Sequence, residues 1–282
     1  MPISVKMICD SVNHKNIRLS TLLIIAPRKI LAEINTHRAF SRNSSSSRAI
    51  PIERFIDTIR KDPVYPLFYG KNQKGMVSGD ELDNEAKIKV NRVIDELRNF
   101  SINSVEILEE LGLHKEQSNR FLEPFTYTAT LISATEWNNF LVLRTHKDAQ
   151  PEIQSVARLI KTCLGVHEPV FLGDNEWHLP FIETKHEDLT LEDKKIMSVA
   201  KCATISYARQ DEDITMERAR AIYERLSNSN PIHASPFEHQ AKPIADSNEA
   251  THLTLSDNEL WCGNFRGWMQ LRHTIKNNYV PY

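Results

Sequence analysis

The segment 33–51 holds the residues whose types and spacing best suit chemistry with an anion. Arg38 and Arg48 bracket a run of serines, so two cations stand near the ends of a stretch rich in hydroxyl groups. Serine side chains bond nearby backbone rather than continue a helix, and we therefore expect a loop whose hydroxyl and N–H groups can bind a ligand. A solvated serine linker is the plainer alternative, but Phe40 and Ile50 supply apolar anchors that flexible linkers usually lack.

Two further arginines lie in a second polar region. Arg120 stands four residues before a proline, and Arg144 lies five residues after Asn139. Taken alone, Arg144 would be interpreted as an exposed charge at a helix end, because most arginines are surface residues. The planar guanidinium group, however, favours two-pronged contacts with phosphates. Together with Arg38 and Arg48, these arginines form a candidate site for anionic ligands.

A third polar region lies nearer the end of the chain. The segment 198–207 contains Ser206, and the segment 233–239 ends at His239. Apolar residues at helical spacing predict an amphipathic helix over 216–226, between the two. The three regions are far apart in the sequence, so the fold must bring them together.

Strands and turns that position these regions are predicted from side-chain alternation. Alternating apolar residues at 3–7 and a β-rich run at 18–26 predict two strands, with a turn over 13–16. A further strand is expected at 125–132, where β-branched and aromatic residues dominate.

Helices are predicted on either side of the polar regions. A short helix over 27–34, which starts at a proline, should deliver His37 and Arg38. A helix that begins at a proline and ends near a glycine is expected over 151–165. Apolar spacing over 90–111 predicts one long helix or a helical hairpin, with a role in the core.

Two segments allow more than one interpretation. The segment 62–79 gathers prolines and glycines between aromatic residues, and is either an ordered lid or a passive connection. The segment 263–273 is either an amphipathic C-terminal helix or a segment whose arginines face a nucleotide or cofactor. His178 lies in a predicted loop, and we interpret it as a structural histidine with satisfied hydrogen bonds.

The composition excludes several classes of protein. The 282 residues include 35 lysines and arginines and 37 aspartates and glutamates, so nothing indicates a broad surface for nucleic acid or membrane. No apolar run reaches the length of a membrane span, and the first residues lack the pattern of a signal peptide, so we expect a cytoplasmic protein. Four widely spaced cysteines without a C-x-x-C pair indicate reduced thiols, and no metal site is predicted.

The three polar regions resemble the signatures of the flavin-dependent thymidylate synthase family. The first follows the family's Arg-His-Arg-x-x-Ser-x-Asn-Glu-x-Ser-x-Arg, with Thr36 at the first arginine and Ser44 at the glutamate. The second matches Asn-Phe-Leu-x-Leu-Arg-x-x-x-x-Ala-Gln-x-Glu-Ile, with Asp148 in place of a histidine near the flavin. The segments 198–207 and 233–239 resemble the family's Ala-Arg-Val-Ser-Tyr and Ser/Thr-Pro-Phe-Glu-His segments.

The order of these signatures differs from that of typical members, in which the third region precedes the first. This order suggests a circular permutation, which is physically reasonable because domain termini often lie close together. The arrangement resembles a divergent, phage-type branch, for which the location would be the host cytoplasm. We expect residues 1–282 to form one α+β catalytic domain in which long helices pack on an antiparallel-type sheet, with 62–79 a loop excursion and 198–282 the permuted segment.

The resemblance also implies ligands for the site. FAD is expected at His37, Arg38, Asn43, Asn139, Ser206 and His239. The substrate dUMP, or a related pyrimidine nucleotide, is expected at Ser46, Arg48, Arg120 and Arg144. Ser46 has no paired base beside it in the sequence, so no protein nucleophile is assigned.

The reaction implied by the resemblance is the conversion of dUMP to dTMP. In the family, methylenetetrahydrofolate supplies one carbon and the flavin, reduced by NADPH, supplies a hydride, while the active site is shared between subunits of a homotetramer. The replacements at Thr36, Ser44 and Asp148 leave two alternatives open. One is a flavin- and folate-dependent pyrimidine nucleotide hydroxymethylase, and the other is an inactive homologue that binds flavin or nucleotide.

Overall fold

A five-stranded sheet forms the centre of the fold, in the order β3-β4-β2-β1-β5. The computed structural model describes residues 3–209, 212–245, 254–256 and 259–275. Neighbouring strands are antiparallel except β5, which pairs in parallel with β1. The strands are β1 (Ser4–Val12), β2 (Arg18–Pro27), β3 (Ser41–Ser44), β4 (Tyr127–Ala134) and β5 (Val170–Phe171). The mixed α+β class predicted from the sequence is confirmed.

Both faces of the central strands are buried, so β2 and β4 consist of apolar residues and small serines and threonines, apart from Arg18 and Tyr127 at their ends. Alternate residues of β2 enter different cores: Leu22 packs with α6 residues on one face, and Leu23 packs with Leu131 and Cys202 on the other. The strands predicted around the turn at 13–16 are confirmed, and Asn16 turns the chain with φ 56°.

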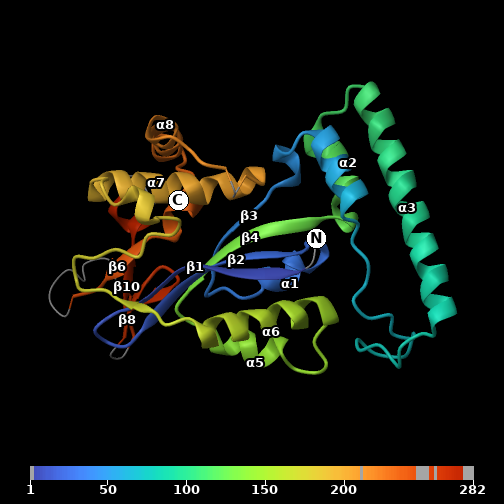
Figure 1. Ribbon diagram of the computed structural model, residues 1–282, viewed down its shortest axis with the longest axis horizontal. Helices are drawn as coiled ribbons and strands as arrows, with labels where there is room; N and C mark the ends of the chain where they lie inside the picture. Colours follow the sequence, from blue (N-terminus) through green and yellow to red (C-terminus); the bar gives the residue numbers. More distant parts are fainter. Residues whose placement is uncertain (1–2, 210–211, 246–253, 257–258, 276–282) are drawn as a thin grey trace.

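Helices cover the two faces of the sheet (Figure 1). On one face lie α5 (Asn138–Arg144) and α6 (Pro151–Val166), and on the other lie α7 (Leu191–Thr204) and α8 (Met216–Ser227). At one end of the molecule stand α2 (Ile52–Lys61) and the long α3 (Asn84–Glu110). No described helix combines the length and the apolar character that a bilayer span requires.

Shorter helices connect these elements. The helix predicted over 27–34 is confirmed as η1 followed by α1, and it ends just before His37. The short α-helices are α1 (Leu31–Asn35) and α4 (Lys115–Ser118). The 3-10 helices are η1 (Arg28–Ile30), η2 (Ser47–Ala49), η3 (Asn119–Phe125), η4 (Thr184–His186), η5 (Ile205–Tyr207), η6 (Ser235–Glu238) and η7 (Leu271–Thr274).

Part of the segment predicted to be a loop forms an edge strand, whereas Ser45 and Ser46 are irregular and Ser47 begins η2. Residues 41–44 form β3 and pair with β4. Ser41 accepts a hydrogen bond from Gln270 Nε2 at 2.9 Å, and Asn43 Nδ2 donates to the carbonyl oxygen of Cys202 at 3.3 Å. Because these polar side chains are engaged by distant segments, the backbone is free to pair with the sheet.

The prediction for 90–111 was partly wrong. The segment is one long helix, α3, and only Ile102 and Val105 within it are fully buried. Val93 and Leu97, which helical spacing assigned to the core, are more than half exposed. The stripe that they belong to therefore faces away from the body of the protein.

The C-terminal segment forms strands and a short 3-10 helix, so of the two interpretations of 263–273 the amphipathic helix is wrong. Positive φ angles at Gly263 and Gly267 turn the chain sharply. Between and beside these turns, Phe265 and Trp268 are buried in a cluster with Leu19 of β2. The strands in this part are β6 (Ala241–Pro243), β7 (Thr254–Ser256), β8 (Glu259–Cys262), β9 (Phe265–Arg266) and β10 (Trp268–Gln270).

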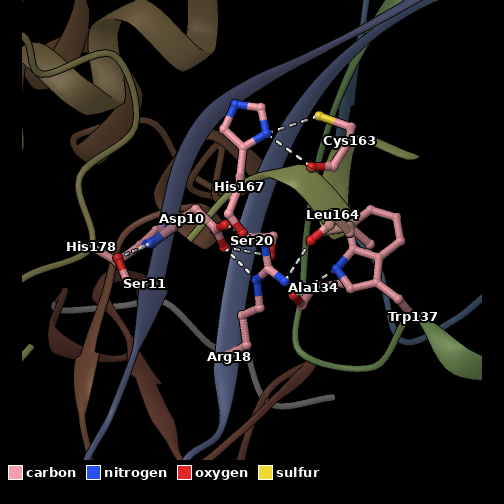
Figure 2. Close-up of polar contacts among 10 residues, drawn as sticks. All are labelled: Asp10, Ser11, Arg18, Ser20, Ala134, Trp137, Cys163, Leu164, His167 and His178. Carbon is pink, nitrogen blue, oxygen red and sulfur yellow. Dashed lines mark hydrogen bonds and ion pairs between the residues drawn. The ribbon is translucent and has the colours of Figure 1, made fainter. Parts of the chain in front are cut away.

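Arg18 closes the C-terminal end of α6 (Figure 2). Its guanidinium group donates to the carbonyl oxygens of Leu164 at 2.8 Å and His167 at 3.0 Å, which helix geometry leaves without partners. The same group forms a two-pronged ion pair with Asp10 on β1, and Ser20 donates to that carboxylate at 2.8 Å. All four cysteines are free thiols, as predicted.

Candidate functional site

An open cavity of about 640 Å³ lies where the first and third polar regions meet. Its walls are η2, the end of α7 with the residues that follow it, one face of α8, and the segment that enters η6. We call it the arginine pocket because four arginines contribute to its lining. They are Arg48, Arg209, Arg218 and Arg225.

A backbone contact holds two walls of the arginine pocket together. The N–H of Ser46 donates to the carbonyl oxygen of Ser206 at 2.9 Å, so lining residues of the first and third regions stand side by side. Ala208 adopts the left-handed conformation, with φ 53°, at the end of η5. This residue ends η5 and turns the chain just before Arg209.

The third wall is a polar face of α8. Arg218, Ile222 and Arg225 are four and seven residues apart, so they share one face of the helix, and all three line the pocket. An adjoining face packs on α7 through the fully buried Ala219. The packing of α8 on α7 therefore determines which face of α8, and which of its arginines, line the pocket.

The ion pairs around the pocket are long and exposed. Glu212 lies 3.4 Å from Arg209 and 3.8 Å from Arg218, and Glu116 lies 3.9 Å from Arg48. Pairs of this kind contribute little to stability because water screens them. A phosphate, which can accept two parallel N–H bonds from a guanidinium group, is a stronger partner. The pocket is thus suited to anions although the chain as a whole is nearly neutral.

Arg120 lies beside the arginine pocket without lining it. Arg120 lies on η3, which is held against η2 by two hydrogen bonds. Asn119 Nδ2 donates to the carbonyl oxygens of Ser47 and Ile50, at 2.8 and 3.0 Å. The Arg120 guanidinium is half exposed and pairs with Glu123 at 2.8 Å.

A second group of predicted residues gathers around Arg144 on α5. Its Nε donates to His37 Nε2 at 3.0 Å, and its Nη2 donates to the Thr36 hydroxyl at 3.2 Å. His37 therefore carries its proton on Nδ1. Burial, together with the nearby Arg144 and Arg42 cations, lowers the pKa of His37 below its ordinary value. The ring stands edge-on to Phe140, with centroids 4.9 Å apart.

This second group lies on the other face of the sheet from the arginine pocket. His37 packs with the core beneath α5 and α6, whereas α7 and α8 bound the pocket (Figure 1). Arg38 and Asn139 are exposed beside His37 and Phe140 in the sequence. Within one chain, Ser46, Ser206 and Arg48 therefore lie together. The residues His37, Arg38, Asn139 and Arg144, which we call the Arg144 group, lie apart from them.

Two predicted ligand contacts are buried. Asn43 is 4% exposed and ties β3 to α7 through its bond to the Cys202 carbonyl. His239 is fully buried, and its Nδ1 bonds Ser133 Oγ at 2.8 Å. Neither residue lines the arginine pocket.

His239 ends a hydrogen-bonded chain that crosses the sheet. Ser133 Oγ bonds Thr21 Oγ1 at 2.6 Å, and Thr21 bonds His178 Nε2 at 2.8 Å. His178 Nδ1 in turn bonds Ser11 at 2.9 Å, as Figure 2 shows. His178 is thus a satisfied structural histidine, as predicted.

The chain keeps both histidines neutral and fixes their tautomers together. Burial lowers the pKa of His178 and of His239 to about 3. Since each neutral imidazole donates once and accepts once, a donor at His178 Nε2 makes Thr21 donate to Ser133, and Ser133 donate to His239. In that arrangement the proton lies on His239 Nε2, which is buried and has no hydrogen-bond partner among the described residues. If His178 Nε2 accepts instead, every bond of the chain reverses and the proton lies on His239 Nδ1.

Sequence reasoning missed several residues of the site. Arg209, Arg218 and Arg225 were not singled out, because arginines on an amphipathic helix usually form a solvated face. A usable signal existed in the seven-residue spacing of Arg218 and Arg225 on either side of Ile222. The arginines of the C-terminal segment pair with the protein itself, Arg266 with Glu136 and Arg272 with Glu238.

Comparison with known proteins identifies one family. Residues 17–170, more than half of the chain, match the sequence profile of the family described as "Thymidylate synthase complementing protein". This range contains the first and second polar regions, whereas the segments 198–207 and 233–239 lie outside it. No match is found among curated proteins.

Solved structures similar to this chain include those of the UMP/dUMP methylase PolB from Streptomyces cacaoi. The complex with 5-Br UMP is 17% identical, with a TM-score of 0.47 over 58% of this chain and 89% of that one. The complex with 5-Br dUMP is 16% identical, with a TM-score of 0.48 over 58% of this chain and 90% of that one.

Proposed function

Because the chain belongs to the thymidylate synthase complementing protein family, the flavin-dependent thymidylate synthases, we propose that it transfers a one-carbon unit to dUMP and reduces it, giving dTMP. FAD is the proposed cofactor, and methylenetetrahydrofolate and NADPH are the proposed co-substrates. Residues 1–282 act as one catalytic domain, in which 198–282 is the permuted part of the family fold.

The arginine pocket is the single observation that carries this proposal. It combines Ser46 and Arg48 from the matched part of the chain with Ser206 from the segment that follows. In this proposal Ser46 and Arg48 bind dUMP, and Arg120, from the adjoining η3, reaches the phosphate when its pair with Glu123 opens. Arginine suits this role because its two N–H groups match two phosphate oxygens.

The lining of the pocket fits a flavin dinucleotide. A cavity of about 640 Å³ with several arginines and serines suits a ligand that combines two phosphates with planar rings. When bound, the reduced flavin supplies the hydride that completes the methyl group. Ser206 would contact it directly, and Asn43 and His239 would support the site from beneath.

The Arg144 group completes the site from a second subunit. His37, Arg38, Asn139 and Arg144 lie on the opposite face of the sheet within one chain, so they cannot reach a ligand in the same chain's arginine pocket. A homotetramer with shared active sites, as in the family, would place them there. Arg144 would then bind the nucleotide, and the other three would bind the flavin.

The protein's own contribution is to hold the reactants together and to exclude water. The guanidinium groups would hold the nucleotide phosphate and so fix the place of the pyrimidine ring within the pocket. No side chain has to form a covalent bond to the substrate, since both the carbon unit and the hydride come from cofactors.

A hydroxymethyl product is the second candidate. It is favoured by Thr36, which stands at a position where the family has an arginine. The Thr36 hydroxyl accepts a hydrogen bond from Arg144. A shorter side chain at this position could admit water, which would capture the methylene group before the hydride arrives.

The test is to purify the protein, record its flavin absorbance, and incubate it with methylenetetrahydrofolate, NADPH and either dUMP or, in a parallel reaction, dCMP. We expect a nucleotide heavier than dUMP by one CH₂ group in mass spectrometry. A hydroxymethyl nucleotide would replace the first candidate by the second. Bound flavin with unchanged dUMP and consumed dCMP would change the substrate, and neither flavin nor product would overturn the proposal.

A further inference from the structure

A stripe of large apolar side chains on α3 faces solvent. Figure 1 shows α3 along one edge of the molecule, beside α2. Apolar side chains at the surface are common singly, but a continuous stripe along a helix marks an interface. The stripe consists of Val93, Leu97, Phe100, Ile107 and Leu111, each between 53% and 77% exposed.

The spacing of the stripe is that of a coiled-coil seam. Successive members are four, three, seven and four residues apart, and Ser104 occupies the position that the seven-residue step skips. With Val90 at its start, the seam follows a heptad pattern over 22 residues, which corresponds to about 33 Å of helix. Leu97, Ser104 and Leu111 occupy a positions, and Val93, Phe100 and Ile107 occupy d positions.

The opposite side of α3 makes the contacts with the body of the protein. Ile102 and Val105 are buried there against α2 and η3. Tyr65 donates to Asp95 at 2.6 Å, and Arg98 donates to Tyr65 at 3.2 Å. The seam therefore plays no part in holding α3 to its own chain.

Charge is distributed unevenly along α3. Residues 84–98 hold all four of its basic residues, and residues 99–110 hold three glutamates and no basic residue. Beside the seam, Lys89 and Glu110 occupy equivalent g positions near opposite ends of the helix. In an antiparallel pair of such helices, g positions face g positions, so each lysine would meet a glutamate of the other helix.

We propose that the α3 helices of two copies of this chain pair antiparallel through this seam. Leu97 packs against the partner's Phe100 on both sides of the two-fold axis, and Lys89 faces the partner's Glu110 twice. A parallel pair would instead set Lys89 beside an isoleucine, because g then faces the e position of the next heptad, Ile94. The interface is self-complementary, as a two-fold axis requires.

This inference does not depend on the proposed reaction, and its test is the molar mass in solution. The double variant Leu97→Glu with Phe100→Glu should have half the molar mass of the wild type in light scattering coupled to gel filtration. The matched control is Ile88→Glu, which is 69% exposed on the same helix but off the seam, and which should keep the wild-type mass. Far-ultraviolet circular dichroism checks that each variant keeps its helices.

A charge exchange tests the antiparallel direction separately. Lys89→Glu should raise the dissociation constant of the pair roughly 5-fold or more, and adding Glu110→Lys should restore the wild-type value. The proposal would be overturned if the Leu97→Glu, Phe100→Glu variant kept the wild-type molar mass, or if the Ile88→Glu control also had half of it. It would likewise be overturned if Lys89→Glu with Glu110→Lys did not restore the wild-type dissociation constant.

Discussion

The polar residues of the candidate site differ in how firmly the protein holds them. Arg48 is 62% exposed in its side chain, and its nearest carboxylate lies 3.9 Å away. His239 is fully buried and bonded to Ser133. An exposed arginine can exchange its carboxylate for a phosphate at little cost, whereas a buried histidine cannot change its partners without disturbing the core. Substitutions at the two residues should therefore have different consequences.

Arg48→Ala should weaken binding of dUMP by about 10-fold or more and leave stability unchanged. One charged hydrogen-bond donor is lost from the arginine pocket, which corresponds to roughly 1.5–3 kcal/mol. Isothermal titration calorimetry with dUMP measures the effect. Arg60→Ala, an exposed arginine on α2 that pairs with Glu106, is the control and should bind as the wild type does. Equal affinities of wild type and Arg48→Ala would remove Arg48 from the site.

The buried histidines should make the protein sensitive to acid. In the folded protein the pKa of His178 is about 3, below its ordinary value near 6.5. The unfolded chain thus binds more protons between these values, and folding stability falls as the pH falls from about 6.5 towards 3, by about 1.4 kcal/mol per unit for each such histidine.

His178→Gln should remove one such contribution. The variant is less stable at pH 7, but its unfolding free energy should fall less steeply than that of the wild type between pH 6 and pH 4. Urea denaturation at several pH values gives the slope. A wild-type slope in His178→Gln would mean that burial does not lower the pKa of this histidine in the folded protein.

At the scale of single elements, the contacts that fix α6 come from outside the helix. Arg18 on β2 closes its last turn and pairs with the buried Asp10 carboxylate (Figure 2). This contact links the start of the sheet to a helix about 150 residues later. It also holds α6 against the face that carries the Arg144 group.

Arg18→Ala should lower the free energy of unfolding by roughly 2–4 kcal/mol, because it leaves the Asp10 carboxylate buried without its cation. Chemical denaturation measures the loss. Arg60→Ala, which removes an exposed ion pair with Glu106, should cost less than about 1 kcal/mol. A similar small loss for both variants would show that Asp10 finds enough compensation from Ser20.

Elements set by local signals could be predicted from the sequence. Pro151 begins α6 and alternation marks β1 and β2, since these signals act within a few residues. The edge strand β3 was missed because its side chains are engaged by Gln270 and Cys202, which no local pattern reveals. The C-terminal strands were missed for the same reason, because β10 forms only by pairing with β6.

At the scale of the whole molecule, the proposed site is divided between two faces. Arg48 lines the arginine pocket beside α8, and Arg144 holds His37 beside α5. The sequence signatures identified both arginines, but the signatures carry no information on which copy of the chain supplies each of them. That depends on assembly, which short motifs do not encode.

If two chains share each site, inactive variants should rescue one another. Arg48→Ala and Arg144→Ala should each have little activity, whereas the two co-expressed should regain about a quarter of the wild-type activity, because random pairing restores some intact sites. The measurement is the rate of product formation by the co-purified mixture. Arg48→Ala co-expressed with the Arg48→Ala, Arg144→Ala double variant is the control and should regain nothing. Activity in the first mixture no greater than in this control would place both arginines in the site of one chain.

The contact between Ser41 and Gln270 has a consequence for how the protein is made. The two residues are 229 positions apart, so at ordinary rates of translation on the order of 10–50 s separate their emergence from the ribosome. Until α7 and α8 have followed, one face of the sheet is uncovered and the arginine pocket lacks a wall. A ribosome-bound chain therefore holds a nearly complete sheet before the arginine pocket, the proposed nucleotide site, has formed.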